Sequence, residues 1–134
     1  MTNNKKMPAD KAKVLLADDS ESVKAVLKSL LIAMGFKKIL LAKDGNQAVK
    51  MLGAQAFDLI ICDWEMPGYQ GDQILQIVRQ SHNNSQSIFI MCTGLNETNK
   101  VKEAISLGVS NFITKPFNHD LIHSKLETYF HLPR

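Results

Sequence analysis

The segment Val14-Leu-Leu-Ala17, followed at once by Asp18-Asp19-Ser20, sets a pattern that the rest of the chain repeats. It is a strand-length apolar run that ends in polar residues, and a helix-period segment comes next. Apolar residues in that segment recur with helical spacing up to Gly35, a residue type that commonly ends helices: Val23, Val26, Leu27, Leu30, Leu31 and Met34. A strand followed by an amphipathic helix is the basic unit of an α/β fold.

Four further apolar runs follow along the chain: Ile39–Ala42, Phe57–Cys62, Ile88–Cys92 and Asn111–Thr114. Helix-period segments come after them: Ala48–Leu52, Ile74–Val78 after Asp72, Val101–Ile105 between a predicted cap at Asn96 and Gly108, and Ile122, Leu126 and Tyr129 after Asn118. Near-continuous hydrophobicity is typical of strands buried on both faces. The sequence therefore predicts an α/β fold with five βα units, a doubly wound, open parallel sheet with helices on both faces.

Length and charge limit the classes of function. The 134 residues fit one domain, which we expect over 13–134 after a flexible basic tail at 1–12. The net charge of +3 is too small to indicate a nucleic acid or an anionic membrane as partner. The longest apolar run, Leu30–Phe36, falls far short of the roughly 18 residues that span a bilayer, and the start lacks a secretory signal, so we expect a cytoplasmic protein. Cys62 and Cys92 lack the spacing of a zinc site or a disulfide framework and are expected to be small buried hydrophobes.

Polar residues follow four of the apolar runs, at the sheet edge where open α/β folds bind ligands: Asp18, Asp19, Asp63, Thr93 and Lys115. Each alone has an ordinary explanation as a cap, a turn residue or a solvated side chain. Together, three carboxylates repel one another, and the usual relief is a hard divalent cation such as Mg²⁺ or raised carboxyl pKa values. A metal ion, a hydroxyl and an ammonium are the parts that phosphoryl transfer needs, and a carboxylate is able to act as its nucleophile.

Four motifs stand at these strand ends: Ala17-Asp18-Asp19-Ser20, Cys62-Asp63-Trp64-Glu65-Met66-Pro67-Gly68, Cys92-Thr93-Gly94 and Thr114-Lys115-Pro116-Phe117. Their order and spacing resemble the receiver domain of two-component response regulators. The resemblance covers about residues 12–131, so the chain is similar to stand-alone CheY-like regulators. It implies a flavodoxin-like strand order of 2-1-3-4-5.

The resemblance also implies a phosphorylation-controlled switch rather than an enzyme acting on a separate metabolite. The implied site residues are the phosphoacceptor Asp63, with Thr93 and Lys115 on the phosphoryl group; the Mg²⁺ ligands Asp18 (through water), Asp19, Asp63 and the backbone carbonyl of Glu65; the switch residues Thr93 and Phe112; and a cis peptide bond between Lys115 and Pro116. The implied partners are a histidine kinase or phosphotransfer protein, and a downstream protein that contacts the face of the fourth helix, fifth strand and fifth helix, roughly 96–130.

Three features depart from the family or fall outside its motifs. Phe112 lacks the hydroxyl of the Tyr often found there in chemotaxis regulators. Glu65 and Leu95 occupy positions that help to set the dephosphorylation rate in this family, and we hypothesise that apolar Leu95 slows attack by water. His119, His123 and Glu127 recur at the spacing of metal ligands on one helix face, although a solvated polar face explains them better.

Two alternative functions use the same residues. One is an adaptor that works without phosphorylation, against which the complete set of Asp18, Asp19, Asp63, Thr93 and Lys115 argues. The other is a phosphatase-like hydrolase with an Asp nucleophile. Against it, Glu65 stands where that chemistry would place a second acid/base Asp, and no cap domain is evident.

Overall fold

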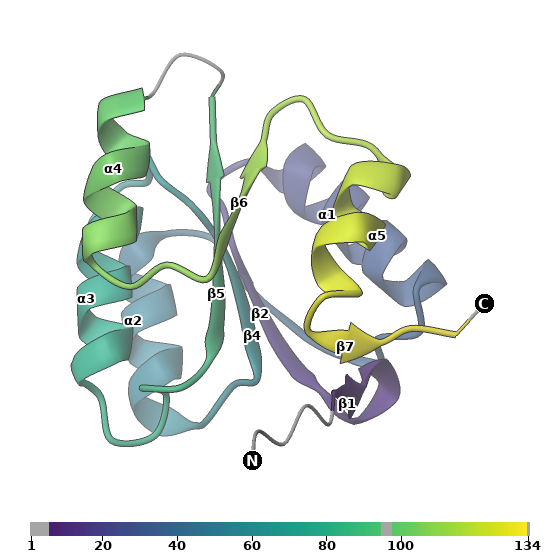
Figure 1. The fold of residues 1–134 in the computed structure, drawn as a ribbon. Helices are drawn as coiled ribbons and strands as arrows, with labels where there is room; N and C mark the ends of the chain where they lie inside the picture. Colours follow the sequence, from purple (N-terminus) through teal and green to yellow (C-terminus); the bar gives the residue numbers. More distant parts are fainter. Residues whose placement is uncertain (1–5, 95–97, 134) are drawn as a thin grey trace.

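A five-stranded, fully parallel sheet forms the centre of the computed structural model, which describes residues 6–94 and 98–133 (Figure 1). Its strands are β2 (Lys13–Ala17), β3 (Lys38–Ala42), β4 (Leu59–Asp63), β5 (Ile88–Thr93) and β6 (Asn111–Thr114). They lie in the order β3-β2-β4-β5-β6. Counted over these five strands, this is the predicted order 2-1-3-4-5, which is thereby confirmed.

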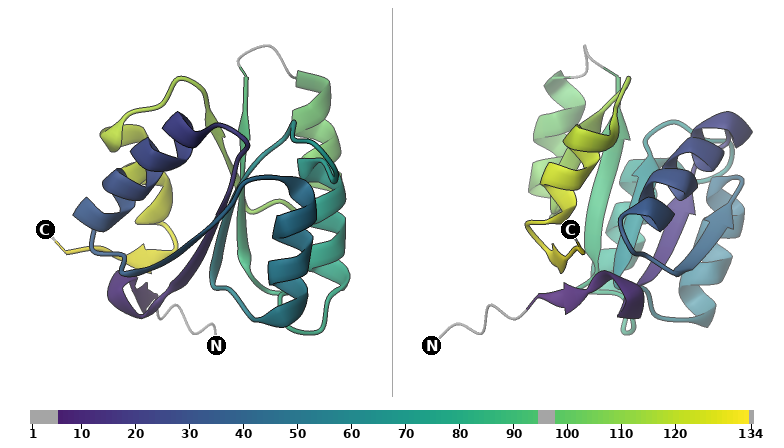
Figure 2. Two further views of the ribbon diagram at one scale, coloured as in Figure 1. Left: turned by 180° about the vertical axis from the view of Figure 1, so that it is seen from behind. Right: turned by 90° about the vertical axis from the view of Figure 1, so that its right-hand side faces the viewer.

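Helices cover both faces of the sheet, as predicted. They are α1 (Glu21–Ala33), α2 (Gly45–Ala54), α3 (Gly71–Gln80), α4 (Thr98–Ser106) and α5 (His119–Leu126). In Figures 1 and 2, α1 and α5 lie on one side of the sheet and α2, α3 and α4 on the other. Side-chain oxygens of Ser20, Asp44 and Asn118 cap α1, α2 and α5. The predicted cap Asn96 lies outside the described residues.

Two hydrophobic cores result because each strand is buried on both faces. Val14 and Leu16 pack on the α1 and α5 side, whereas Leu15 and Ala17 pack on the side of the other three helices. The two cysteines divide in the same way, with Cys92 in the first core and Cys62 in the second. Burial raises the pKa of the Cys62 thiol well above its ordinary value and that of Cys92 to about 12. Both thiols are therefore protonated, small apolar groups, as predicted.

Strand β4 and helix α5 are shorter than predicted. The third strand begins at Leu59 rather than at Phe57, whose backbone N–H donates instead to Asn84 Oδ1 at 2.7 Å. Helix α5 ends at Leu126, so Tyr129 is not part of it. The Tyr129 hydroxyl donates to the backbone carbonyl of Ser110 at 2.9 Å, a contact that fixes the chain after the helix.

Within the stretch expected to be a flexible basic tail, residues 7–11 form two short regular elements. A short strand, β1 (Met7–Pro8), pairs in parallel with β7 (Phe130–His131), and the 3-10 helix η1 (Ala9–Lys11) leads into β2. Ala9 and Ala12 are buried, and the Lys6 ammonium donates to the backbone carbonyl of Glu127. Figures 1 and 2 show the β1–β7 pair beside the amino end of the sheet.

Candidate functional site

Three carboxylates gather at the carboxyl edge of the sheet. Asp18 and Asp19 follow β2, and Asp63 ends the neighbouring strand β4. Their carboxylate oxygens lie within 4.8 Å of one another. The Asp18 side chain is only 3% exposed and that of Asp63 14%, whereas Asp19 faces solvent. Within the described part of the chain, this is the one group of three or more metal-ligating side chains that lie so close together.

The Lys115 ammonium bridges two of these carboxylates. Its Nζ atom lies 3.1 Å from Asp63 Oδ1 and 3.3 Å from Asp18 Oδ2. Lys115 follows β6 at the same edge, and its backbone N–H donates to the carbonyl of Thr93 at 2.9 Å. The Lys115–Pro116 peptide bond is cis. When all are ionised, three carboxylates face this one ammonium and leave a local charge of −2, which favours a divalent cation.

Local contacts hold Asp18 and the loop after Asp63 in place. Asp18 Oδ1 accepts from the backbone N–H of Ser20 at 2.9 Å, which ties the aspartate to the start of α1. After Asp63 the chain forms a loop that is closed where the N–H of Gly71 donates to the carbonyl of Trp64 at 2.7 Å. A Cβ at Gly71 would come within 2.7 Å of the Asp63 carbonyl oxygen, so only glycine permits this close approach.

The charged groups of the site shift one another's pKa values. Burial raises the pKa of Asp63, and the negative charge of Asp18 raises it further, while Lys115 partly offsets both effects. Burial lowers the pKa of Lys115, but the attraction of Asp63 and Asp18 outweighs it, so the net shift is upward. The ammonium is thus firmly charged, whereas Asp63 is harder to ionise than an ordinary aspartate.

Thr93 lies on β5, which pairs with the strand of Asp63, and Phe112 lies on β6, the edge strand beyond it. Thr93 is buried at the end of β5, and Phe112 on β6 is half-buried against the core that contains Leu15 and Ala17. Phe112 is in register with Met91 of β5. Leu95, two residues after Thr93, lies outside the described residues. Glu65 lies in the loop directly after β4, with an exposed side chain.

One residue at this edge was not predicted from the sequence. Lys100, in the first turns of α4, places its ammonium 3.3 Å from Glu65 Oε1 and 5.6 Å from the centre of the Trp64 ring. Helix periodicity places Lys100 on α4 but does not reveal which loop it faces, and no sequence signal identified it. Trp64 itself is buried, with 3% of its surface exposed.

The histidines of α5 do not form a comparable cluster. The rings of His119 and His123 stack with centroids 5.5 Å apart, and His123 Nδ1 lies 3.7 Å from Glu127 Oε2. These side chains are not among the described groups of three close metal ligands. The interpretation as a solvated polar face therefore fits them best.

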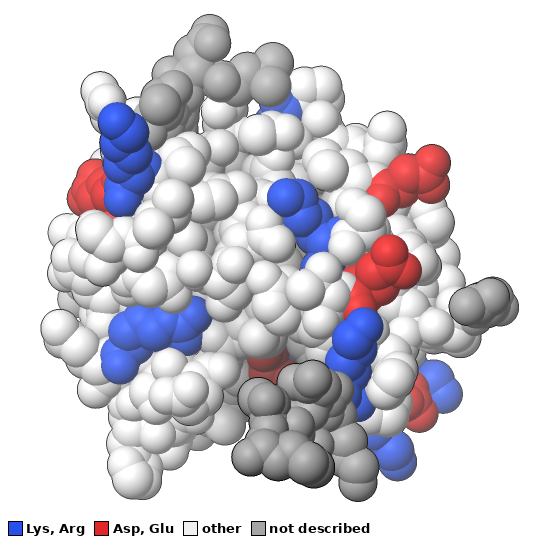
Figure 3. All heavy atoms as spheres, in the orientation of Figure 1, with Lys and Arg blue, Asp and Glu red and all other residues white. Residues whose placement is uncertain are grey.

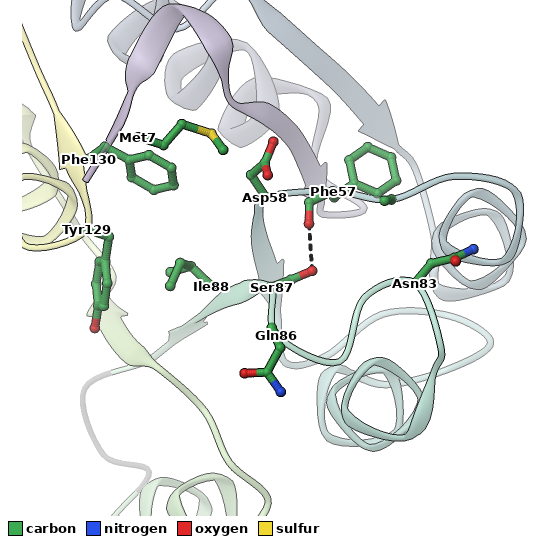
Figure 4. Close-up of a pocket in the computed structure, with 10 residues that line it drawn as sticks. Met7, Phe57, Asp58, Asn83, Gln86, Ser87, Ile88, Tyr129 and Phe130 are labelled. Carbon is green, nitrogen blue, oxygen red and sulfur yellow. Dashed lines mark hydrogen bonds between the residues drawn. The ribbon is translucent and has the colours of Figure 1, made fainter. Parts of the chain in front are cut away.

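A separate hollow lies at the opposite, amino end of the strands (Figure 4). It has a volume of about 360 Å³, and Met7, Asp58, Ile88 and Phe130 are among its lining residues. The hydroxyl of Ser87 donates to the Phe57 carbonyl at 2.6 Å beside it. Neither an acidic cluster nor a lysine is among these lining residues, so this hollow does not share the chemistry of the carboxyl edge.

Charge and hydropathy of the described residues give no further site. On the face drawn in Figure 3, basic and acidic side chains are interspersed, in agreement with the small net charge. Among residues 6–94 and 98–133, no helix has the length and apolar character needed to cross a bilayer.

Known proteins resemble the chain over most of its length. The family model of the response regulator receiver domain matches residues 14–127. A probable chemotaxis protein CheY of Rhizobium etli is 35% identical and covers 91% of this chain and 95% of its own length. The chemotaxis protein CheY of Pseudomonas aeruginosa is 32% identical over 88% of this chain and 95% of its own length. The solved structure of the chemotaxis response regulator CheY4 of Vibrio cholerae superposes with a TM-score of 0.82 at 28% identity, covering 89% of this chain and 98% of that one.

The family match and the curated relatives agree with the fold and with the acidic edge of the sheet. Sequence, topology and site thus lead to one assignment: the chain belongs to the response regulator receiver domain family.

Proposed function

We propose that this receiver domain is a switch controlled by phosphorylation of Asp63. The observation that carries the proposal is the Lys115 ammonium held 3.1 Å from Asp63 Oδ1 and 3.3 Å from Asp18 Oδ2 in a largely buried acidic site. The phosphoryl donor is a histidine kinase or a phosphotransfer protein, the partner class with which receiver domains work. Asp63 is the nucleophile because it is the carboxylate that ends the strand and contacts Lys115 while retaining access to solvent.

The reaction is a transfer from nitrogen to oxygen. A carboxylate oxygen of Asp63 attacks phosphorus in line with the phosphohistidine P–N bond, a P–O bond forms, and the leaving nitrogen takes the electron pair of the broken bond. The product is an acyl phosphate on Asp63. Lys115 neutralises the charge that the phosphoryl oxygens bring, and the Thr93 hydroxyl donates a hydrogen bond to one of them.

The residues at the edge fit a magnesium ion. Magnesium prefers oxygen ligands, and the carboxylates of Asp18, Asp19 and Asp63 provide an all-oxygen set within 4.8 Å. We assign Asp19 and Asp63 as direct ligands with the backbone carbonyl of Glu65, and Asp18 as a ligand through water. The bound ion would supply positive charge to the carboxylates and to the incoming phosphoryl group.

The signal to a downstream protein follows from a change in the groups that Thr93 and Lys115 contact. A phosphoryl group on Asp63 draws both side chains toward it, and Phe112 turns inward as Thr93 moves. The change alters the face formed by α4, β6 and α5, which we assign to a downstream protein. The protein catalyses its own phosphorylation and dephosphorylation but turns over no separate metabolite.

The test combines intact mass with Trp64 fluorescence. Wild type, Asp63→Asn and the control Asp10→Asn, an exposed aspartate of η1, are titrated with MgCl₂ and then treated with acetyl phosphate. One phosphoryl adduct is expected in wild type and Asp10→Asn only when Mg²⁺ is present, with none in Asp63→Asn. An adduct that persists in Asp63→Asn, or none in wild type with either acetyl phosphate or a phosphorylated kinase domain, would overturn the proposal. Repeated turnover of an aryl phosphate would favour a hydrolase instead.

A further inference from the structure

Lys100 connects α4 to the loop that follows Asp63. Its ammonium makes two separate interactions there, an ion pair with Glu65 at 3.3 Å and a cation–π contact with Trp64 at 5.6 Å. Trp64 and Glu65 are the first and second residues after Asp63. The ring is buried and therefore fixed, so it gives the lysine a rigid support.

Glu65 is the residue that such a contact would restrain. Its side chain is 70% exposed, and a long, solvated carboxylate explores many orientations unless an interaction holds it. Glu65 follows Asp63 by only two residues, so an unrestrained carboxylate there adds negative charge next to a site that already carries three carboxylates. Phosphoryl donors are anionic, so a fourth negative charge at the entrance slows their approach.

We infer that Lys100 is a positioning residue that holds the Glu65 carboxylate at the rim of the site and so keeps the path of anionic phosphodonors to Asp63 open. The inference rests on the proposed function, because it concerns the rate at which Asp63 is phosphorylated. Lys100 acts through Glu65 and does not itself touch the phosphoryl group.

A double-mutant cycle separates positioning from simple charge. The rate of phosphorylation by acetyl phosphate with saturating Mg²⁺ is measured for wild type, Lys100→Ala, Glu65→Gln and the double variant. If Lys100 acts only through its charge, Lys100→Ala slows the reaction equally whether residue 65 is Glu or Gln. If Lys100 positions Glu65, Lys100→Ala slows the reaction only when the Glu65 carboxylate is present. We expect Lys100→Ala to slow the reaction about fivefold at low ionic strength, the effect that one surface ion pair supports, and at most about twofold in the Glu65→Gln background.

Two further readouts distinguish this role from general structural support. The slowing in Lys100→Ala should decrease as salt rises, because salt screens exposed charges. The emission of Trp64 should change in Lys100→Ala, because the ring loses its ammonium neighbour. Lys100→Arg, which keeps both interactions, should retain the wild-type rate, and Lys102→Ala, which removes an exposed lysine of the same helix, is the matched control.

The outcomes separate this inference from the proposed function. If wild type is phosphorylated on Asp63 but Lys100→Ala reacts at the wild-type rate, or slows equally in both backgrounds, the assignment of Lys100 is wrong and the proposed function stands. If wild type acquires no phosphoryl group from acetyl phosphate or from a phosphorylated kinase domain, the proposed function is wrong and this inference falls with it.

Discussion

Replacing Lys115 by Met removes the only ammonium that contacts Asp18 and Asp63 among the described residues. Methionine keeps the length and apolar character of the lysine stem, so the change is confined to charge and hydrogen bonding. The two carboxylates then lose their common partner and repel each other and Asp19 at close range. We therefore expect Lys115→Met to be less stable than the parent protein at neutral pH.

The burial of the three side chains sets the magnitude. Removing one partner of a fully buried ion pair costs about 3–5 kcal/mol, because an uncompensated charge remains. Here the Asp18 side chain is 3% exposed, but those of Asp63 and Lys115 are 14% and 30% exposed. Water recovers part of the loss, so we expect about 2–3 kcal/mol. In a domain of this size that corresponds to a decrease in Tm of roughly 10 °C.

Urea denaturation measures this difference directly. The single tryptophan, Trp64, and far-UV circular dichroism report unfolding of Lys115→Met, the parent protein and the control Lys102→Met, with EDTA or with MgCl₂. The destabilisation should shrink when Mg²⁺ is added, since the ion replaces the missing positive charge, and also as acid protonates the carboxylates. Equal stability of Lys115→Met and the parent in EDTA would refute the electrostatic account. A loss that neither Mg²⁺ nor acid reduces would assign Lys115 a packing role instead.

Variants at three further positions test other contributions to stability. Asp63→Asn should be more stable than the parent protein at neutral pH, because the raised pKa of Asp63 means that its ionised form is disfavoured in the folded state. This gain in stability should vanish when urea denaturation is carried out at a pH below the ordinary pKa range of a carboxyl group. Asn84→Ala should lower the free energy of unfolding by about 2–3 kcal/mol, since it leaves the N–H of Phe57 without its acceptor; Asn84→Asp, which keeps that acceptor, should lose less in the same assay. Phe130→Ala should cost about 3–5 kcal/mol by urea denaturation, because it empties a buried site and removes the edge-to-face contact with Phe36 at 5.4 Å; a loss below about 1 kcal/mol would show that β7 contributes little.

The sheet and its acidic edge could be predicted from local patterns. Each strand is a short apolar run, and each helix between strands has apolar residues at helical spacing. A parallel sheet brings the carboxyl ends of all its strands to one edge, so the residue after each run is placed without any knowledge of tertiary contacts. This is why Asp18, Asp63 and Lys115 were identified as neighbours although 97 positions separate the first from the last.

Polar residues with structural roles could not be predicted in this way. Asn84 looks like an ordinary turn residue, yet its amide donates to the carbonyls of Leu52 and Gln55 at 2.9 and 3.2 Å. Arg79 is half-buried and donates to the carbonyls of Gly108 and Ser87 at 2.8 and 2.7 Å. These side chains satisfy backbone groups of distant loops, and no periodicity records which loop a side chain will meet.

The two ends of the sheet therefore differ in how far their structure can be predicted from the sequence. At the carboxyl edge, strand ends place the functional groups, and the topology alone brings them together. At the amino end, β1 and β7 lie outside residues 14–127, the part matched by the family model, and they meet through a pairing of Met7 with Phe130 across nearly the whole chain. A pair of two-residue strands has no hydrophobic pattern long enough to predict it. Because the strands separate these two ends, β1, η1 and β7 add to the amino end without changing the register that places Asp63 beside Lys115.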